Sequence, residues 1–288
     1  MWPAVMHNRD IVLDMIPYEI ADACSTGKVN YQFSSRPISY GMKQEKIYVY
    51  GKHALMEALR NSPKAVDKVY LESRQDKELE ALVSKLGLSV GKLSEGMGEG
   101  LEKGAKHQGV IGRVVLSHLV RPFAEFIGKL KITPDTALVV LGEIQDPQNV
   151  GAIIRSAAGF GIAGVLIPEH NQAPVTGSVG KVSAGMAFRI PLVAIGNVNE
   201  TLRDLKKKGF WIYGLAGGAK QTVGEEKFEE PSVFVLGNES AGIRVKTLEV
   251  CDIPLSIPMN PQCESLNVAA SAAVVLYAWS DKHPAALK

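Results

Sequence analysis

Polar side chains able to take part in chemistry follow three apolar runs in the second half of the sequence. Asn149 and Arg155 lie in QDPQNVGAIIRSA, after the run ALVVLGEI, and Glu239 lies in VLGNESAGI, directly after another apolar run. Ser265 and Asn267 stand where the small-sided apolar segment VAASAAVVLYAW begins. Guanidinium, carboxylate, amide and hydroxyl groups can together bind a polar ligand by donating and accepting hydrogen bonds.

Each of these three loops also has a purely structural explanation. Asn149 and Arg155 can be ordinary residues of a helix surface, and Glu239 can be a capping acid in a turn. Ser265 alone could cap the helix that follows it. Because ligands of parallel α/β sheets bind at the carboxyl ends of the strands, three polar loops in such positions favour a ligand site over three unrelated caps.

The second half of the chain alternates apolar runs with helical patterns. Five near-continuous apolar runs predict parallel strands covered on both faces, over residues 137–144, 163–168, 191–196, 210–216 and 232–237. Asp146 followed by Pro147 is a good helix start, so a helix is expected over 146–158, and an amphipathic pattern predicts another over 199–209. The expected fold class is α/β with a parallel sheet.

The first half indicates a smaller α/β unit. The alternating pattern predicts strands and helices in turn, over residues 47–51, 53–61, 66–72, 76–87 and 108–116. A glycine-rich segment, 95–109, separates the last two of these elements and is expected to be a loop.

Domain boundaries follow from these patterns. Residues 1–45 show no clean period and are expected to form an N-terminal extension, with Met42 as the natural start of the protein. The small α/β unit is expected over 46–116 and the second domain over 137–288, joined by a linker over 117–136 that contains prolines.

Composition excludes several classes of protein. With 46% hydrophobic and 22% charged residues the chain is typical of a soluble globular protein, and its net charge of +2 requires any nucleic-acid contact to come from local basic patches. The apolar run 268–279 is shorter than the about 20 residues that span a bilayer. The cysteines form no CxxC pair and the histidines show no metal-ligand spacing, so we expect a reduced, cytoplasmic protein without a bound metal.

The stretch GFGIAG at 159–164 matches the GxGxxG pattern of dinucleotide-binding loops. Such a loop must follow a strand and open a helix, whereas this stretch follows a predicted helix and precedes a predicted strand. Gly159 or Gly161 is therefore expected to end the helix, and an NAD-dependent dehydrogenase is the weaker alternative.

In order along the chain, NVGAIIRSAAGFG, VLGNESAG and IPMNPQCESLNVAASAA resemble the three signature motifs of the SpoU, or TrmH, family of RNA ribose 2'-O-methyltransferases, within the SPOUT class. The resemblance covers residues 47–280 and implies a parallel sheet tied in a deep trefoil knot. The segments YGKHALMEAL and HQGVIG, at the start and the end of the small α/β unit, resemble those of an RNA-binding domain like ribosomal protein L30e. This resemblance implies that residues 46–116 bind the RNA substrate. This pairing is similar to the branch that methylates a guanosine of large-subunit (23S) rRNA.

The resemblance also implies roles for individual residues. S-adenosyl-L-methionine would be held largely by backbone groups at the positions that match the family's cofactor site, which are Gly237, Ile257, Leu266 and Met259. Arg155 matches the catalytic arginine and is expected to contact the target phosphate, since a guanidinium is a poor base. The other matching polar positions, expected to orient Arg155 and the ribose, are Asn149, Glu239, Ser265 and Asn267. Pro261 departs from the family, which usually has glycine there, and this puts the shape of the cofactor loop in question.

Partners follow from the same resemblance. A homodimer through the C-terminal domain is implied, with the site completed across the interface. RNA is expected to contact basic residues of both domains, namely Lys52, His53, Lys106, His107 and Lys181, whereas Lys206–Lys208 is expected to be a solvated helix end. Two alternatives stay open. One is a tRNA ribose 2'-O-methyltransferase, which shares the three motifs, and the other is a ribosome-directed antibiotic-resistance methyltransferase.

Overall fold

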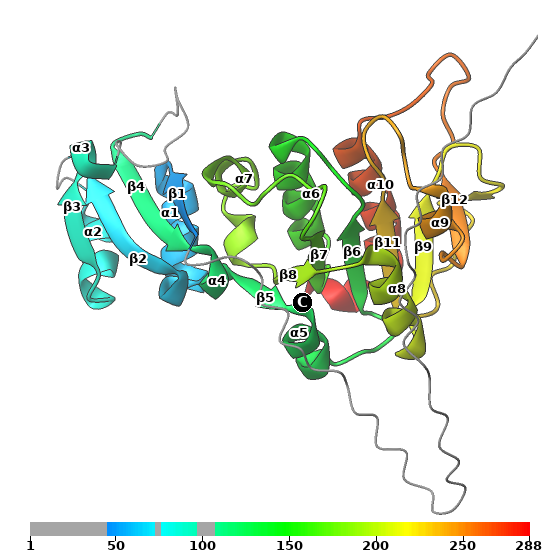
Figure 1. Cartoon of the computed structure of the whole chain (residues 1–288), viewed down its shortest axis with the longest axis horizontal. Helices are drawn as coiled ribbons and strands as arrows, with labels where there is room; N and C mark the ends of the chain where they lie inside the picture. The colour runs from blue at the N-terminus through cyan, green and yellow to red at the C-terminus, as the bar shows by residue number, and fades with distance from the viewer. Residues whose placement is uncertain (1–44, 73–75, 97–106) are drawn as a thin grey trace, which may run out of the picture. The chain divides into compact units, whose positions relative to one another are not determined.

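The computed structural model describes residues 45–72, 76–96 and 107–288, in which two β-sheets are formed (Figure 1). The expected extension up to residue 44, including Met42, lies outside these ranges, as do most of the glycine-rich segment 95–109 and Lys106. No helix in the described ranges is both long and apolar enough to cross a membrane.

The first sheet has four strands in the order β1-β4-β2-β3, with bounds Lys46–Tyr50, Val110–Val115, Val66–Leu71 and Ser89–Lys92. Strand β4 is antiparallel to both β1 and β2, whereas β3 is parallel to β2. The helices of this unit are α1, α2, the short α3 and a 3-10 turn, with bounds Lys52–Asn61, Lys77–Lys85, Leu93–Gly96 and Pro63–Ala65. The predicted alternation is therefore present, with β3 and α3 added by segments that have no strong pattern.

The second sheet has eight strands, and every pair of neighbours in it is parallel. Its order is β10-β12-β9-β11-β6-β7-β8-β5, with bounds Gln221–Thr222, Ile253–Ser256, Trp211–Leu215, Ser232–Leu236, Ala137–Leu141, Gly164–Pro168, Leu192–Ile195 and Val120–Pro122. All five predicted strands are present, which confirms the parallel α/β sheet.

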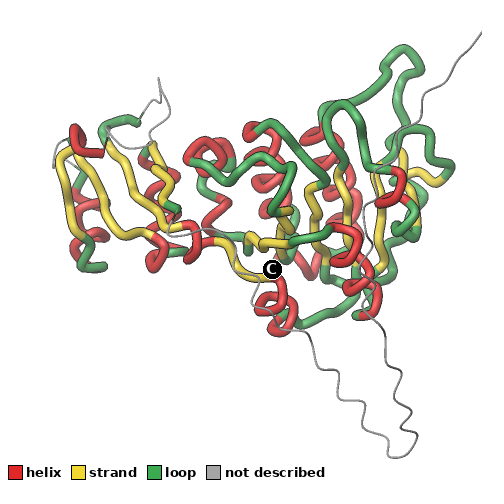
Figure 2. Tube along the Cα trace, in the orientation of Figure 1, coloured by secondary structure: helices red, strands yellow, loops and turns green. Residues whose placement is uncertain are grey.

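Helices cover both faces of the second sheet (Figure 2). The longer ones are α6, α8 and α10, with bounds Pro147–Gly159, Val198–Lys207 and Val268–Lys282. The shorter ones are α4, α5, α7, α9 and two 3-10 turns, with bounds Leu116–Leu119, Phe123–Lys129, Gly177–Val182, Val245–Leu248, Met186–Phe188 and Pro284–Leu287. Asp146 caps α6 by accepting a hydrogen bond from the N–H of Gln148 at 2.8 Å, as the sequence predicts.

Alternate residues of the central strands explain why these strands are apolar throughout. In β6, Val139 belongs to the core that includes α6 and α10, whereas Val140 belongs to the separate core that includes α5 and α8. Because successive side chains of a strand point to opposite faces, both cores draw on every central strand.

The segment 117–136, expected as a linker, is partly built into the second sheet. Strand β5 pairs with β8 at the edge of that sheet, and α5 places Phe126 in the core that includes α8. Phe126 packs directly over Gly164, where an added Cβ would stand 2.7 Å from the ring.

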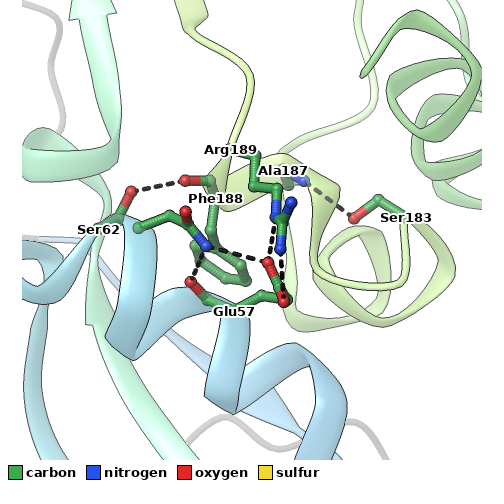
Figure 3. Close-up of polar contacts among 7 residues, drawn as sticks. Glu57, Ser62, Ser183, Ala187, Phe188 and Arg189 are labelled. Atoms are coloured by element: carbon green, nitrogen blue, oxygen red, sulfur yellow. Dashed lines mark hydrogen bonds and ion pairs between the residues drawn. The ribbon is translucent and has the colours of Figure 1, made fainter. Parts of the chain in front are cut away.

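The first unit contacts the segment between α7 and β8 through polar groups (Figure 3). The carboxylate of Glu57, on α1, accepts hydrogen bonds from Nε and Nη2 of Arg189, the second at 3.0 Å. Beside this pair, Ser62 Oγ donates to the carbonyl of Phe188 at 3.0 Å. The Arg189 guanidinium lowers the pKa of Glu57 and so favours the ionised pair.

Candidate functional site

The predicted polar loops meet at the carboxyl edge of the second sheet. Strands β12, β9, β11 and β6 are neighbours and run in the same direction. The loop with Ile257 follows β12, the loop with Gly237 and Glu239 follows β11, and α6 with Asn149 follows β6. The order of the strands therefore gathers segments that are far apart in the sequence.

Three side chains from the three loops are bonded to one another, and we call Glu239, Asn149 and Asn267 the polar triad. Asn149 Nδ2 donates to Glu239 Oε1 at 3.1 Å, and Asn149 Oδ1 accepts from Asn267 Nδ2 at 2.9 Å. Asn149 is 8% exposed, so its amide is used almost entirely inside the protein. The triad fixes the three loops relative to each other.

Glu239 is held as a carboxylate. Its burial raises the pKa, but the hydrogen bonds that it accepts from Asn149 and from the backbone N–H groups of Gln145 and Asp146 outweigh burial, and the net shift lowers the pKa. The two backbone donors lie 3.0 Å from its oxygens. Glu239 therefore joins the start of α6 to the loop after β11 as an ionised acceptor.

Asn267 has a second task at the start of α10. Its Oδ1 accepts hydrogen bonds from the N–H groups of Ala269 and Ala270, at 2.8 and 3.3 Å, which makes it the N-cap of the helix. The possibility that Ser265 caps this helix alone is wrong, because Asn267 does so. Its side-chain nitrogen thus donates to Asn149, and its side-chain oxygen accepts from the first turn of the helix.

Gly237 is required by the protein's own backbone. A Cβ at this position would lie 2.2 Å from the carbonyl carbon of Gly242, because the loop folds back through hydrogen bonds between Asn238 and Gly242. Gly142 is equally constrained, since its N–H donates to the carbonyl of Leu236 at 2.6 Å. The loops after β6 and β11 therefore touch backbone to backbone.

The expected cofactor positions present unused backbone groups. No hydrogen bond joins the N–H or carbonyl of Gly237, Ile257, Met259 or Leu266 to another residue of the described ranges. The side chains of Met259 and Leu266 are 37% and 39% exposed, which is high for apolar residues. Free amide groups beside exposed apolar side chains suit a flat nitrogen heterocycle, whose edge needs a donor and an acceptor and whose face needs apolar contact.

Pro261 fits the turn in which it lies. The N–H of Cys263 donates to the carbonyl of Asn260 at 2.8 Å, which closes a four-residue turn with Pro261 at its second position. Proline is favoured there because its fixed φ matches the turn. The departure from the family pattern thus has a local structural reason.

Arg155 and Ser265 stand apart from the polar triad. Arg155 is exposed on α6, and neither its guanidinium nor the hydroxyl of Ser265 has a hydrogen bond or ion pair with any residue that the structure describes. Of the five expected catalytic residues, the structure brings together the three of the triad. The other two are free to meet a ligand or a second protein chain.

One loop at this edge is absent from the sequence prediction. Strand β9 lies between β11 and β12, so the loop that begins at Ala216 lies between the two expected cofactor loops. Its glycines, in GLAGGA, were a usable signal. The sequence does not reveal the position of the loop, because Pro254 breaks the strand pattern of β12.

The structure also describes the glycines of GFGIAG and two of the expected RNA contacts. Gly159 ends α6 and Gly161 has a φ of +74°, so GFGIAG closes a helix as expected from the order of elements. Among the expected RNA contacts, Lys52 forms an ion pair with Asp76 at 2.6 Å, and Lys181 lies 5.0 Å from the ring centre of Tyr50. Within the described ranges, no group of three or more His, Cys, Asp or Glu residues could hold a metal ion.

Two family models match the sequence. The model of the SpoU rRNA Methylase family matches residues 136–277, and a model described as RNA 2'-O ribose methyltransferase substrate binding matches residues 48–118.

The sequence matches curated relatives over nearly their whole length. The 23S rRNA (guanosine-2'-O-)-methyltransferase RlmB of Xanthomonas axonopodis is 35% identical over 241 residues, which are 82% of this chain and 96% of the relative. The protein of the same name from Vibrio parahaemolyticus is 34% identical over 80% of this chain and 94% of its own length.

Solved structures share the fold. The SpoU methyltransferase AviRb from Streptomyces viridochromogenes, in complex with AdoMet, superposes with a TM-score of 0.71 at 20% identity, covering 83% of this chain and 91% of its own. A crystal structure of an RNA 2'-O ribose methyltransferase superposes with a TM-score of 0.66 at 23% identity, covering 84% and 90%.

Proposed function

Because this chain belongs to the SpoU rRNA methylase family, we propose that it transfers a methyl group from S-adenosyl-L-methionine to the ribose 2'-hydroxyl of a guanosine in 23S rRNA. One observation carries the proposal: relatives named for this reaction are 34–35% identical over 94–96% of their own length. We propose the cytoplasm as the place of the reaction, where such a substrate would be met.

The cofactor positions fit this donor. The backbone groups of Gly237, Ile257 and Leu266 would bind the adenine edge, and the exposed side chain of Met259 would cover part of its face. When bound, S-adenosylmethionine supplies a methyl group made electrophilic by the positive sulfur. A site that binds adenine through backbone groups needs no phosphate-binding loop, which agrees with the role of GFGIAG as a helix end.

Arg155 would hold the RNA. Its exposed guanidinium, which no described residue engages, can bind a target phosphate through two hydrogen bonds and stabilise negative charge that develops on the 2'-oxygen. The polar triad would hold the loops that align the ribose hydroxyl with the methyl donor. Ser265, free on the third loop, would contact the ribose directly.

Finer features of the fold belong to the same proposal. We assign RNA binding to an L30e-like domain over 46–116, and methyl transfer to a knotted domain over 137–288, after a linker over 117–136. The first assignment is supported by the substrate-binding model over 48–118. The knot is proposed from membership of the family, and the strand order, with β11 between β9 and β6, is compatible with it.

A homodimer through the C-terminal domain is supported by an apolar stripe on α10. Val274 and Tyr277 are 40% and 58% exposed on this helix, and Tyr277 packs edge-on against Phe160 at the end of α6, with ring centres 6.0 Å apart. Because Arg155 lies on the same helix as Phe160 and has no bond to the polar triad within one chain, an interface here would complete the site.

The proposal is tested by labelled methyl transfer. The protein is given labelled S-adenosylmethionine with unmodified 23S rRNA or, separately, with tRNA, and the RNA is then digested in alkali. A methylated 2'-oxygen cannot attack the next phosphate, so label in alkali-resistant dinucleotides of the rRNA is expected. Label only in tRNA would mean that the substrate is tRNA and not 23S rRNA. Label in neither RNA would reject the proposed reaction.

A further inference from the structure

Two adjoining hollows lie beside the polar triad, on the side of α8 and α9. The first is a cavity of about 430 Å³ at the carboxyl ends of β6, β7 and β8, and its polar lining includes Glu143, His170, Asn171, Asn197, Asn199 and Arg244. The second is a groove of about 490 Å³ between α8 and α9, lined by Asn199, Arg203, Lys206, Lys246, Glu249 and Val250. Asn199 belongs to both linings, so the two hollows adjoin.

The groove has a net positive lining, because three cations, Arg203, Lys206 and Lys246, and one carboxylate, Glu249, face it. Arg203 and Lys246 are exposed, and neither has an ion pair with another residue of the described ranges. Lys206 is paired with Asp252 at 2.8 Å and so contributes less. With Glu249 offsetting one of the two unpaired cations, the groove still keeps a net positive charge, which attracts a polyanion more than a neutral ligand.

The cavity differs in chemistry from the groove. Its two charged groups are paired, since Arg244 lies 2.7 Å from Glu143, and the rest of its polar lining consists largely of amides. Side-chain amides offer a donor and an acceptor together, which matches the edge of a nucleobase better than a phosphate. The volume falls in the range of roughly 300–1000 Å³ that holds a small organic group.

The same loops build the cavity and the polar triad. The carbonyl of Glu143 accepts hydrogen bonds from Asn238 Nδ2 and Gln145 Nε2, both at 2.9 Å. The N–H of Gln145 in turn donates to Glu239 of the triad at 3.0 Å. A strand of RNA held at the triad can therefore continue into the cavity without leaving the carboxyl edge of the sheet.

We propose that these two hollows bind the substrate RNA next to its target nucleotide. Backbone phosphates lie against Arg203 and Lys246 in the groove, and one unstacked nucleotide enters the cavity. This inference rests on the proposed function, because it assumes that the ligand at the triad is RNA. It adds a contact surface on the methyltransferase domain to the one proposed on residues 46–116.

The groove is tested with a charge-removing double variant, Arg203→Gln with Lys246→Gln. Its matched control, Lys207→Gln with Lys208→Gln, removes the same charge at the end of the same helix but outside the groove. The probe is a fluorescent, unmodified 23S rRNA transcript, and its binding is measured by anisotropy over a range of salt concentrations.

We expect the groove variant to bind the transcript about tenfold more weakly, and the slope of log affinity against log salt to fall by about 1.4–1.8. The turnover at saturating RNA and the affinity for S-adenosylmethionine should match the wild type, because neither residue touches the triad or the cofactor loops. Equal affinity and slope for the groove and control variants would overturn the groove contact.

The cavity is tested by filling it. Gly196 lines the cavity and an added Cβ there would meet no atom within 4 Å, so the side chain of Gly196→Leu starts in open space and is expected to fill part of the cavity. Gly224→Leu, equally open but outside both hollows, is the control. We expect a raised KM for RNA only for Gly196→Leu; an unchanged KM would remove the cavity from the RNA path.

These outcomes separate the inference from the function on which it rests. If the wild type methylates no RNA, the proposed function fails. If the wild type methylates 23S rRNA and the groove and cavity variants behave as their controls, only the inference fails.

Discussion

The side chains of Asn149 and Asn267 are bonded to each other at 2.9 Å although 118 positions separate them in the chain. Asn267 also caps α10, and Asn149 also binds Glu239, so a helix end and a carboxylate are held through one pair of amides. This pair makes the geometry of three loops depend on one buried side chain.

Asn149→Ala should therefore cost both stability and activity. The substitution leaves Nδ2 of Asn267 without its partner and removes one of the hydrogen bonds that Glu239 accepts, which corresponds to about 1–3 kcal/mol of unfolding free energy. Urea denaturation and labelled methyl transfer measure the two effects. The control is Gln148→Ala, next in the chain but exposed; equal effects of the two substitutions would argue against the triad.

Glu239 gives the protein a pH dependence of defined sign. Its pKa in the folded protein is lowered from the ordinary value of 4.5, so the ionised group stabilises the folded state above that value. The contribution is lost as the pH falls through the folded pKa. The difference in unfolding free energy between the wild type and Glu239→Gln should be largest at neutral pH and shrink in acid; a difference that stays constant to about pH 3 would contradict this.

Arg155→Ala should separate activity from stability. Because the guanidinium is exposed and bonded to no described residue, unfolding free energy should change by less than about 0.5 kcal/mol. Methyl transfer should fall by about 10²–10³-fold, since a group that stabilises developing charge is lost. Arg155→Lys should restore little, because an ammonium lacks the planar pair of donors. Full activity of either variant would refute the role of Arg155.

Gly177 tests the contact between α7 and the first sheet. A Cβ at this residue would lie 2.0 Å from the carbonyl oxygen of Tyr48, so Gly177→Ala should lower the unfolding free energy by about 1–3 kcal/mol. Gly180→Ala on the same helix is the matched control, because its Cβ would make only ordinary contacts at 3.6–3.7 Å. Thermal unfolding of both variants gives the comparison, and equal stability would mean that Gly177 does not pack against the backbone of β1.

Tyr277→Glu tests the proposed dimer. A carboxylate in the middle of the apolar stripe of α10 should oppose burial of that stripe and convert dimers to monomers, as measured by light scattering after size exclusion. Leu287→Glu, on an apolar residue that is 54% exposed outside α10, is the control. A dimer that survives Tyr277→Glu unchanged would place the interface elsewhere.

The sequence predicts elements better than it predicts their neighbours. Runs such as 137–144 and 232–237 are recognisable because both faces of these strands are buried, and Asp146 with Pro147 marks the start of α6 by local chemistry. In contrast, β12 is short and contains Pro254, and β5 lies in a segment that reads as a linker. Elements whose pairing is decided by the rest of the sheet leave little local pattern.

The same limit applies to the site. Polar residues at strand ends can be named from the sequence, but the bonds of Asn149 to Glu239 and Asn267 depend on β11 standing next to β6, which no periodicity encodes. The free state of Arg155 is likewise a property of three-dimensional packing. The sequence names the five candidate polar residues. Only the fold separates the three that are bonded to one another from Arg155 and Ser265, which are not.

The position of β11 in the sheet also determines when the domain can fold during synthesis. Strand β6 is completed at residue 141, and its partner on one side, β7, follows within the next elements, but its partner on the other side begins only at Ser232. At about 5–20 residues per second, a ribosome takes several seconds to make that stretch. Throughout this interval one edge of the apolar strand β6 has no partner in the nascent chain. Unpaired strand edges are sites at which incomplete sheets aggregate. Translation speed and chaperone supply should therefore affect the yield of this protein.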